Sequence, residues 1–321
     1  FLVIFIISLI QTYGSIFNTS WILLYKTSLD IYSLGFNIGS LSYFSKYIIF
    51  ATGGLFVYYF YKKDIVKSLS IAIIITLYTI ITRNRIMILP IVIPFLLLFL
   101  IKYRKLDLKK VVLYGFLGFL VVYIVYALRL FRHYGDLATF ISTFDFMTFN
   151  ERLFDMLLNS DGELGLRNVF LYFIYKNNHF INFNKGHTYI RLLFMFVPTK
   201  FSFGLKPPDF AISMGSAWLG DFNNTRYSTH PTLYGDCFAN FYWFGILLAI
   251  FWALFVTIID KIVYKSDLIK KLNYITIFGS MYVIIGRGSV YNGVYLGVFS
   301  AIMLNSMLLI YRQIPKISIK T

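Results

Sequence analysis

The residues best suited to chemistry lie in one polar and aromatic stretch, residues 186–245. Its ionisable side chains include His187, Arg191, Lys200, Lys206, Asp209, Asp221, Arg226, His230 and Asp236. Membrane proteins that concentrate polar and helix-breaking residues in one segment usually do their work there. The alternative interpretation is a solvated loop that only connects two spans.

Two histidines and two aspartates of this stretch are candidates for proton transfer. The imidazoles of His187 and His230 can take a proton from an attacking hydroxyl near neutral pH, or orient that hydroxyl. The carboxylates of Asp221 and Asp236 offer the same chemistry in a dry environment. Asp236 stands one turn into an apolar span, where an ionisable group is costly. Each of these residues could instead cap a turn or face water, and His230-Pro231 could simply lead into a helix.

Arginines at the ends of apolar segments suggest anion binding. The planar guanidinium stays charged and can hold phosphate or carboxylate through two hydrogen bonds. Arg83 and Arg85 fall in a short turn between two apolar segments, and Arg287 falls between the last two. Arg85 and Arg287, with Arg191 as a third candidate, would clamp a diphosphate at the level of the lipid headgroups. The alternative is that these arginines only anchor helix ends to lipid phosphates.

The composition excludes an ordinary soluble domain. Hydrophobic residues make up 58% of the chain and charged residues 14%, and the formal net charge is +16. No soluble fold presents the basic residues as a stripe, so nucleic acid is not an expected partner. Cys237 is the one cysteine, and neither the histidine spacing nor the acidic residues resemble a metal site. We therefore expect no metal and no cofactor.

Hydropathy predicts an all-α, polytopic transmembrane helical bundle formed by a single domain, residues 1–321. The expected spans are residues 39–61, 66–82, 86–101, 111–128, 238–259, 272–286 and 290–311. Residues 129–231 form a large loop region on the outer face. Within it, residues 147–165 have the apolar spacing of an amphipathic surface helix, and residues 192–198 are a short interfacial or re-entrant piece. Because Phe1 lies inside an apolar run, we expect the N-terminus to be incomplete.

Basic residues predict the orientation of these spans. Lysines dominate the segments 62–67, 102–110, 260–271 and 312–320, which we place in the cytoplasm. The spans then alternate without conflict. Arginines dominate the opposite side, where the positive-inside rule gains nothing from them. This asymmetry favours a binding function for the outer arginines.

With these residues in view, the chain resembles the bacterial oligosaccharide repeat-unit polymerases, the Wzy-type O-antigen and capsule polymerases. The matching stretches are RIMIL at 85–89, GHTY at 186–189, FVP at 196–198, LKPP at 205–208, PTLYGDCFANFYWFG at 231–245 and Arg287-Gly288. Thr199-Lys200 stands where the family has an arginine after the proline. The Arg-x10-Gly repeats of some members are not found.

The resemblance implies a GT-C-like membrane fold and a glycosyltransferase that needs no nucleotide sugar. Its substrates would be undecaprenyl-diphosphate-linked oligosaccharides, joined at the outer face of the bacterial plasma (inner) membrane, with the active site facing the periplasm or exterior. Arg83, Arg85, Arg191 and Arg287 would bind the diphosphate, and His187, His230 or Asp236 would assist the attacking hydroxyl. The lipid bilayer and a chain-length regulator protein are the expected further partners.

Three alternatives stay open at this stage. An O-antigen ligase would share the donor and the arginines and differ only in its acceptor. A lipid-linked oligosaccharide flippase would instead be expected to show two related halves with charges facing an inner cavity, a pattern not visible here. A non-catalytic assembly partner would tolerate the loss of Arg85 or Arg287.

Overall fold

The protein is represented by a computed structural model that describes residues 39–82, 85–102, 144–158, 166–175, 185–221 and 228–313, with isolated residues between 112 and 142. Every regular element in these residues is a helix, and they contain no strand. The all-α prediction is therefore confirmed. The expected span at 111–128 lies almost entirely outside the described residues, as does the apolar start of the chain.

Three helical stretches are long and apolar enough to cross a membrane, namely Thr232–Lys265, Leu268–Gly286 and Val290–Gln313. Shorter apolar helices cover Ile65–Thr76, Ile86–Leu96 and Phe210–Leu219. These features give the chain the character of a membrane protein. The first stretch begins six residues before the predicted span at 238–259 and ends six residues after it. Its earlier start includes the polar Asp236, whose carboxylate accepts hydrogen bonds from neighbours in the fold.

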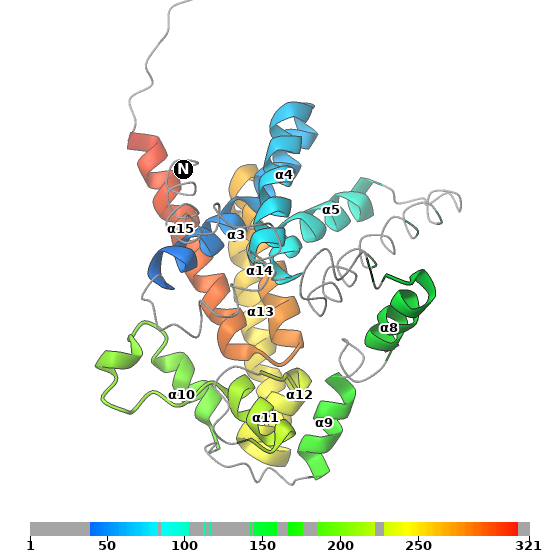
Figure 1. Cartoon of the computed structure of the whole chain (residues 1–321). Coiled ribbons are helices and arrows are strands. Elements are labelled where there is room, and N and C mark those ends of the chain that lie inside the picture. Colours follow the sequence, from blue (N-terminus) through cyan, green and yellow to red (C-terminus); the bar gives the residue numbers. More distant parts are fainter. Residues whose placement is uncertain are drawn as a thin grey trace, which may run out of the picture.

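Helix α14 lies at the centre of the bundle (Figure 1). The bundle helices are α3 (Gly39–Tyr61), α4 (Ile65–Thr82), η1 (Arg85–Ile88), α5 (Leu89–Lys102), α13 (Leu248–Lys265), α14 (Leu268–Gly286) and α15 (Val290–Gln313). Helix α14 packs against α3, α5, α13 and α15. The side chains of Ile277 and Met281 are completely buried in this core.

Small residues allow α14 to approach its neighbours closely. A Cβ on Gly54 of α3 would lie 2.5 Å from backbone atoms of Leu272 and Asn273 in α14. Any side chain there would push the two helices apart. Interfaces between helices in membranes are commonly built from such small residues.

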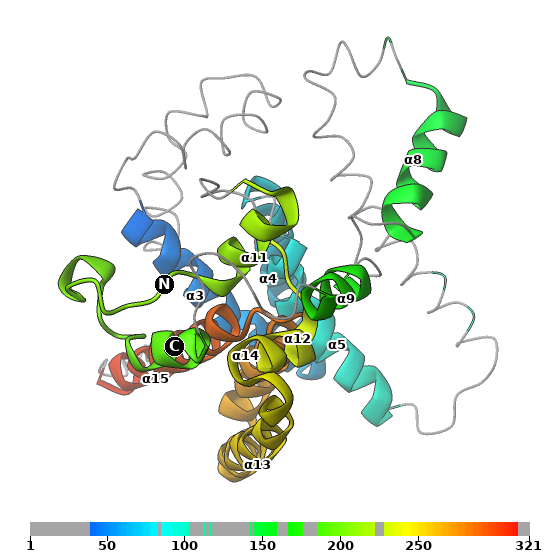
Figure 2. The same ribbon diagram turned by 90° about the horizontal axis from the view of Figure 1, so that it is seen from below.

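Helix α13 leaves the bundle on one side (Figure 2). Among its residues, Ile259 is the one that is buried. The exposed positions include Ile250, Phe251, Leu254 and Ile258. A surface of this kind is expected where a helix faces hydrocarbon instead of water.

Shorter helices gather at the end of the bundle where α14 ends and α15 begins (Figure 1). They are α9 (Leu166–Tyr175), α10 (His187–Leu193), η4 (Thr199–Phe201), α11 (Phe210–Leu219), α12 (Thr232–Phe241) and η5 (Tyr242–Leu247). Phe173, Phe210, Met214 and Phe238 form a separate small core between α9, α11 and α12. This core fixes α11 and α12 relative to each other.

The predicted surface elements are found in altered form. The expected amphipathic helix at 147–165 corresponds to α8 (Phe146–Leu158), which buries Phe149 and Leu153. Within the expected interfacial or re-entrant piece at 192–198, α10 ends at Leu193 and turns follow up to Pro198.

Candidate functional site

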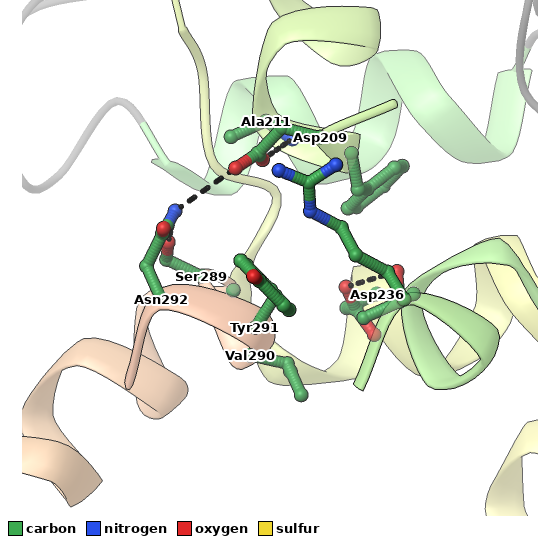
Figure 3. Close-up of a pocket in the computed structure, with 11 residues that line it drawn as sticks. Asp209, Ala211, Asp236, Ser289, Val290, Tyr291 and Asn292 are labelled. Carbon is green, nitrogen blue, oxygen red and sulfur yellow. Dashed lines mark hydrogen bonds between the residues drawn. The ribbon is translucent and has the colours of Figure 1, made fainter. Parts of the chain in front are cut away.

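A narrow pocket lies at the junction of α14 and α15, where four parts of the chain meet (Figure 3). Its lining residues are Thr188, Arg191, Asp209, Phe210, Ala211, Asp236, Gly288, Ser289, Val290, Tyr291 and Asn292. They come from α10, the start of α11, α12, and the turn and first helical residues of α15. Every lining residue outside α15 and its preceding turn belongs to the polar stretch 186–245.

The first turn of α15 faces this pocket. Gly288 adopts a φ of 94°, and a Cβ there would lie 2.6 Å from the carbonyl oxygen of Thr232. The Thr232 backbone N–H donates to the carbonyl of Arg287 at 3.0 Å, which joins the start of α12 to this turn. The first N–H groups of a helix have no acceptor within the helix. Those of Val290–Asn292 therefore present partial positive charge at the pocket wall.

Arg191 supplies a full positive charge to the same pocket. Its Nη1 donates to the carbonyl of Pro207, and its guanidinium carbon lies 4.4 Å from the centre of the Tyr291 ring. The Nε atom is buried and has no hydrogen-bond partner. Lys206 lies 5.7 Å from the same ring. Burial, together with the Arg191 cation, lowers the pKa of Lys206.

Asp209 connects α11 to α15. One carboxylate oxygen accepts from the Ala211 N–H at 2.9 Å and caps the N-terminus of α11. The other accepts from the Asn292 amide at 3.2 Å, and that amide also donates to the Ser289 hydroxyl at 3.0 Å (Figure 3). The carboxylate is thereby held at the pocket wall, facing the first turn of α15.

A buried hydrogen-bond network holds α10 against α12. Asp236 and Asn240 are both 0% exposed. The Thr188 hydroxyl donates to one oxygen of Asp236 at 3.2 Å, and the Asn240 amide donates to the other oxygen at 3.2 Å. The Thr188 N–H donates to the Asn240 side-chain oxygen at 3.0 Å. The Asp236 carboxyl is thus fixed by neutral donors, with no basic side chain among its hydrogen-bond partners.

His230 is a partly buried imidazole close to charged neighbours. Burial, helped by the Arg287 cation and opposed by Asp209, lowers the pKa of His230 to about 4. Its Nδ1 atom is buried and has no hydrogen-bond partner. At neutral pH this side chain is therefore uncharged and can accept a hydrogen bond.

The structure brings some of the predicted site residues together. Arg191 and Asp236 line the pocket. His230 and Arg287 interact electrostatically beside it. His187 opens α10 but does not line the pocket, and burial lowers its pKa. Asp221 lies exposed beyond the end of α11.

The predicted pairing of Arg85 with Arg287 stays a prediction. Arg83 and the side chain of Arg85 lie outside the described part of the chain, although the backbone of Arg85 opens η1. Arg287 is found at the predicted turn between the last two helices.

Several pocket residues were not singled out by the sequence. Thr188, Asn292 and Tyr291 carry no pattern of their own, because they acquire a role only through contacts across the fold. Asp209 could have been recognised, since an aspartate before the apolar run FAISM is a typical helix cap. Asn240 lies one turn beyond Asp236, which is a weak signal of a shared helix face.

Among the described residues, no three His, Cys, Asp or Glu side chains come close enough to hold a metal ion. Comparisons with protein-family models, curated proteins and solved structures each gave no match to this chain. The fold and site therefore define a helical membrane protein with a mixed-charge pocket at one end of its bundle.

Proposed function

We propose that the chain is a membrane glycosyltransferase that polymerises undecaprenyl-diphosphate-linked oligosaccharide repeat units at the outer face of the bacterial plasma membrane. The observation that carries this proposal is the pocket at the start of α15. The first turn of α15, Arg191 and the partly exposed Asp209 line it together. A transferase acting on a lipid diphosphate requires this combination of an anion site with a proton acceptor.

The pocket has a volume of about 10 Å³, which admits single oxygen atoms, so its positive side would hold a diphosphate at the pocket mouth through one of its oxygens. Helix N-termini bind phosphate groups through their unpaired N–H groups and their dipole. Arg191 adds a fork of donors, and its guanidinium carbon lies over the Tyr291 ring. Lys206 lies near the same ring and adds a second cation. We assign the leaving diphosphate to this side, with Arg287 contributing from the adjoining turn.

The reaction follows from this assignment. A hydroxyl at the non-reducing end of one repeat unit attacks the anomeric carbon of the growing chain. A new C–O bond forms while the C–O bond to the diphosphate breaks, and the leaving group keeps the electron pair. The hydroxyl proton passes to a pocket base, for which Asp209 is better placed than the fully buried Asp236.

His230 has the properties of an orienting group. Its low pKa makes it a weak base, so hydrogen bonding to the sugar hydroxyl is a better assignment than proton removal. Neither histidine is among the lining residues, but His230 interacts electrostatically with Asp209 and Arg287 beside the pocket, so His187 is the weaker candidate. The bilayer would hold the lipid portions of both substrates, and a chain-length regulator would act from outside this pocket.

Complementation in cells lacking the chromosomal copy tests this function. Surface glycan length is scored on a gel beside the membrane level of each variant. We expect Arg191→Ala and Asp209→Asn to reduce long glycan to single repeat units, with partial recovery for Arg191→Lys. Asp209→Asn keeps a side-chain oxygen for the α11 cap but turns a donor toward the Asn292 amide, so the membrane level of this variant is the check on its folding. The control is Lys200→Ala, an exposed cation in η4 outside the pocket.

Two outcomes would contradict the proposal. Long glycan of normal length from Arg191→Ala at a normal membrane level would remove the diphosphate assignment. Loss of even the single repeat unit from the surface would favour a flippase or a ligase, because a polymerase defect still allows one unit to cross and be attached.

A further inference from the structure

A second, larger cavity lies at the opposite end of α14. It has a volume of about 670 Å³ and is formed by α3, α4, α14 and α15. Ile269 and Asn273 near the start of α14 line it, whereas Gly288 in the first pocket follows the end of that helix. At 1.5 Å per residue, the two sites are roughly 22–29 Å apart along α14. That distance matches the thickness of a bilayer core and places the sites in opposite leaflets.

The wall of this cavity is apolar along most of its length. Ile48, Leu55, Ile71, Ile74 and Leu308 are among its lining residues. Polar groups are few. A cavity of this size between helices of a membrane protein is open to lipid chains, and its wall suits hydrocarbon.

One end of the cavity is polar and basic. Tyr59, Lys67 and Tyr311 line it there. The Lys67 ammonium donates to Asp64 at 2.7 Å, yet its side chain is 63% exposed. An ammonium has three donors, so Lys67 can hold a second acceptor without leaving Asp64.

The surrounding charge is complementary to an anionic headgroup. Lys62, Lys63, Lys270 and Lys271 belong to the ends of helices that form this cavity, although Lys67 is the basic residue that lines it, and the nearby acidic residues are Asp64 and Asp267. Both aspartates are already engaged, since Asp64 pairs with Lys67 and Asp267 caps α14. Basic residues beside an apolar site attract anionic lipids.

Asn273 supplies an independent indication of a ligand. It lines the cavity, it is 1% exposed, and its side-chain amide donates to the Ile269 carbonyl at 2.8 Å. Its side-chain oxygen is buried and has no hydrogen-bond partner. Such an acceptor is costly in an apolar wall unless a donor reaches it.

We propose that this cavity binds an anionic phospholipid of the leaflet opposite the first pocket. The acyl chains lie against the isoleucines and leucines, and the phosphate lies beside Lys67. This site goes beyond the proposed transferase function and does not depend on it.

Native mass spectrometry of the full chain in detergent tests the proposal with phosphatidylglycerol and phosphatidylcholine of identical acyl chains. We expect roughly fivefold greater retention of phosphatidylglycerol, the effect of one lysine beside a headgroup with a net negative charge. Ile71→Trp adds a bulky ring to the cavity wall and should reduce that retention. Ile73→Trp is the matched control, because Ile73 is on the same helix but does not line the cavity.

Lys67→Gln gives a second measurement that does not disturb packing. The Lys67→Gln variant should still retain lipid but lose the preference for phosphatidylglycerol. Lys62→Gln, at a residue that does not line the cavity, should keep that preference. Equal retention of both lipids by the unmodified chain, or undiminished retention by Ile71→Trp, would overturn the proposal. Retention of no lipid at all would also overturn it and would indicate that another part of the chain occupies the cavity.

Discussion

The buried network between α10 and α12 gives a prediction that does not depend on the function. Thr188→Val keeps the shape of the side chain but removes its hydroxyl. One oxygen of Asp236 then loses its donor at 3.2 Å, and the Asn240 amide loses an acceptor at 3.1 Å. The Asn240 amide still reaches the Asp236 carbonyl at 2.7 Å, so the main loss is at the buried carboxyl.

The magnitude follows from the cost of leaving a buried polar group unsatisfied, about 1–3 kcal/mol. Because α10 is a short helix joined to α12 by these bonds, the change should appear as local opening of α10. Such a free-energy change corresponds to roughly a 5- to 150-fold loss of amide protection. Hydrogen exchange, measured by mass spectrometry on peptides covering residues 186–194, reports this loss of amide protection directly.

Two controls separate this network from general effects. Thr257→Val removes a hydroxyl that donates to the Ala253 carbonyl at 2.8 Å on the exposed side of α13, and it should leave exchange in α10 unchanged. Thr188→Ser keeps the hydroxyl and should retain most of the protection. Unchanged exchange in residues 186–194 of Thr188→Val would refute the reasoning that these bonds hold α10 in place.

Two further predictions concern the turn before α15 and His230. Gly288→Ala should destabilise the protein by about 1–3 kcal/mol in thermal unfolding, because Gly288 has a positive φ and a Cβ there would meet the Thr232 backbone. The control is Gly286→Ala, whose Cβ would meet no described atom within 4 Å, so it should be neutral or slightly stabilising. His230 has a folded-state pKa of about 4, below the ordinary 6.5, so only the unfolded state binds a proton between those values. The unfolding free energy should therefore fall as pH decreases from about 6.5 to 4, and His230→Gln should reduce that slope; identical pH profiles would contradict the prediction.

The sequence predicted the class of fold because composition and hydropathy act over whole helices. For this reason the sequence predicted closely the bounds of the two helices on either side of Arg287, which are both long apolar runs. The start of α12 was not predicted, because Asp236 and Asn240 lower the local hydropathy. Their hydrogen bonds to Thr188, 48 and 52 residues away, make a helix at that place acceptable. Patterns within the sequence do not report such distant partners.

For the candidate site, the sequence indicated the stretch of chain that supplies most of the pocket but not the contacts that form it. The polar stretch 186–245 does contain most of the pocket lining, since its charged residues are conspicuous in an apolar chain. Arg191 was ranked below Arg287, but Arg191 is the one that lines the pocket. Its position depends on the Tyr291 ring and the Pro207 carbonyl, neither of which is near it in sequence.

The joining of Thr232 to Arg287 and Gly288 has a consequence for how the protein is made. The pocket takes its residues from Thr188 through Asn292, so about a hundred further residues must be synthesised after Thr188 before the pocket can close. At 5–20 residues per second this is a delay of roughly 5–20 seconds. During that time the polar stretch lacks the helix turn that covers it. A chain stopped before residue 288 would possess nearly all of the site's charged side chains and still have no pocket.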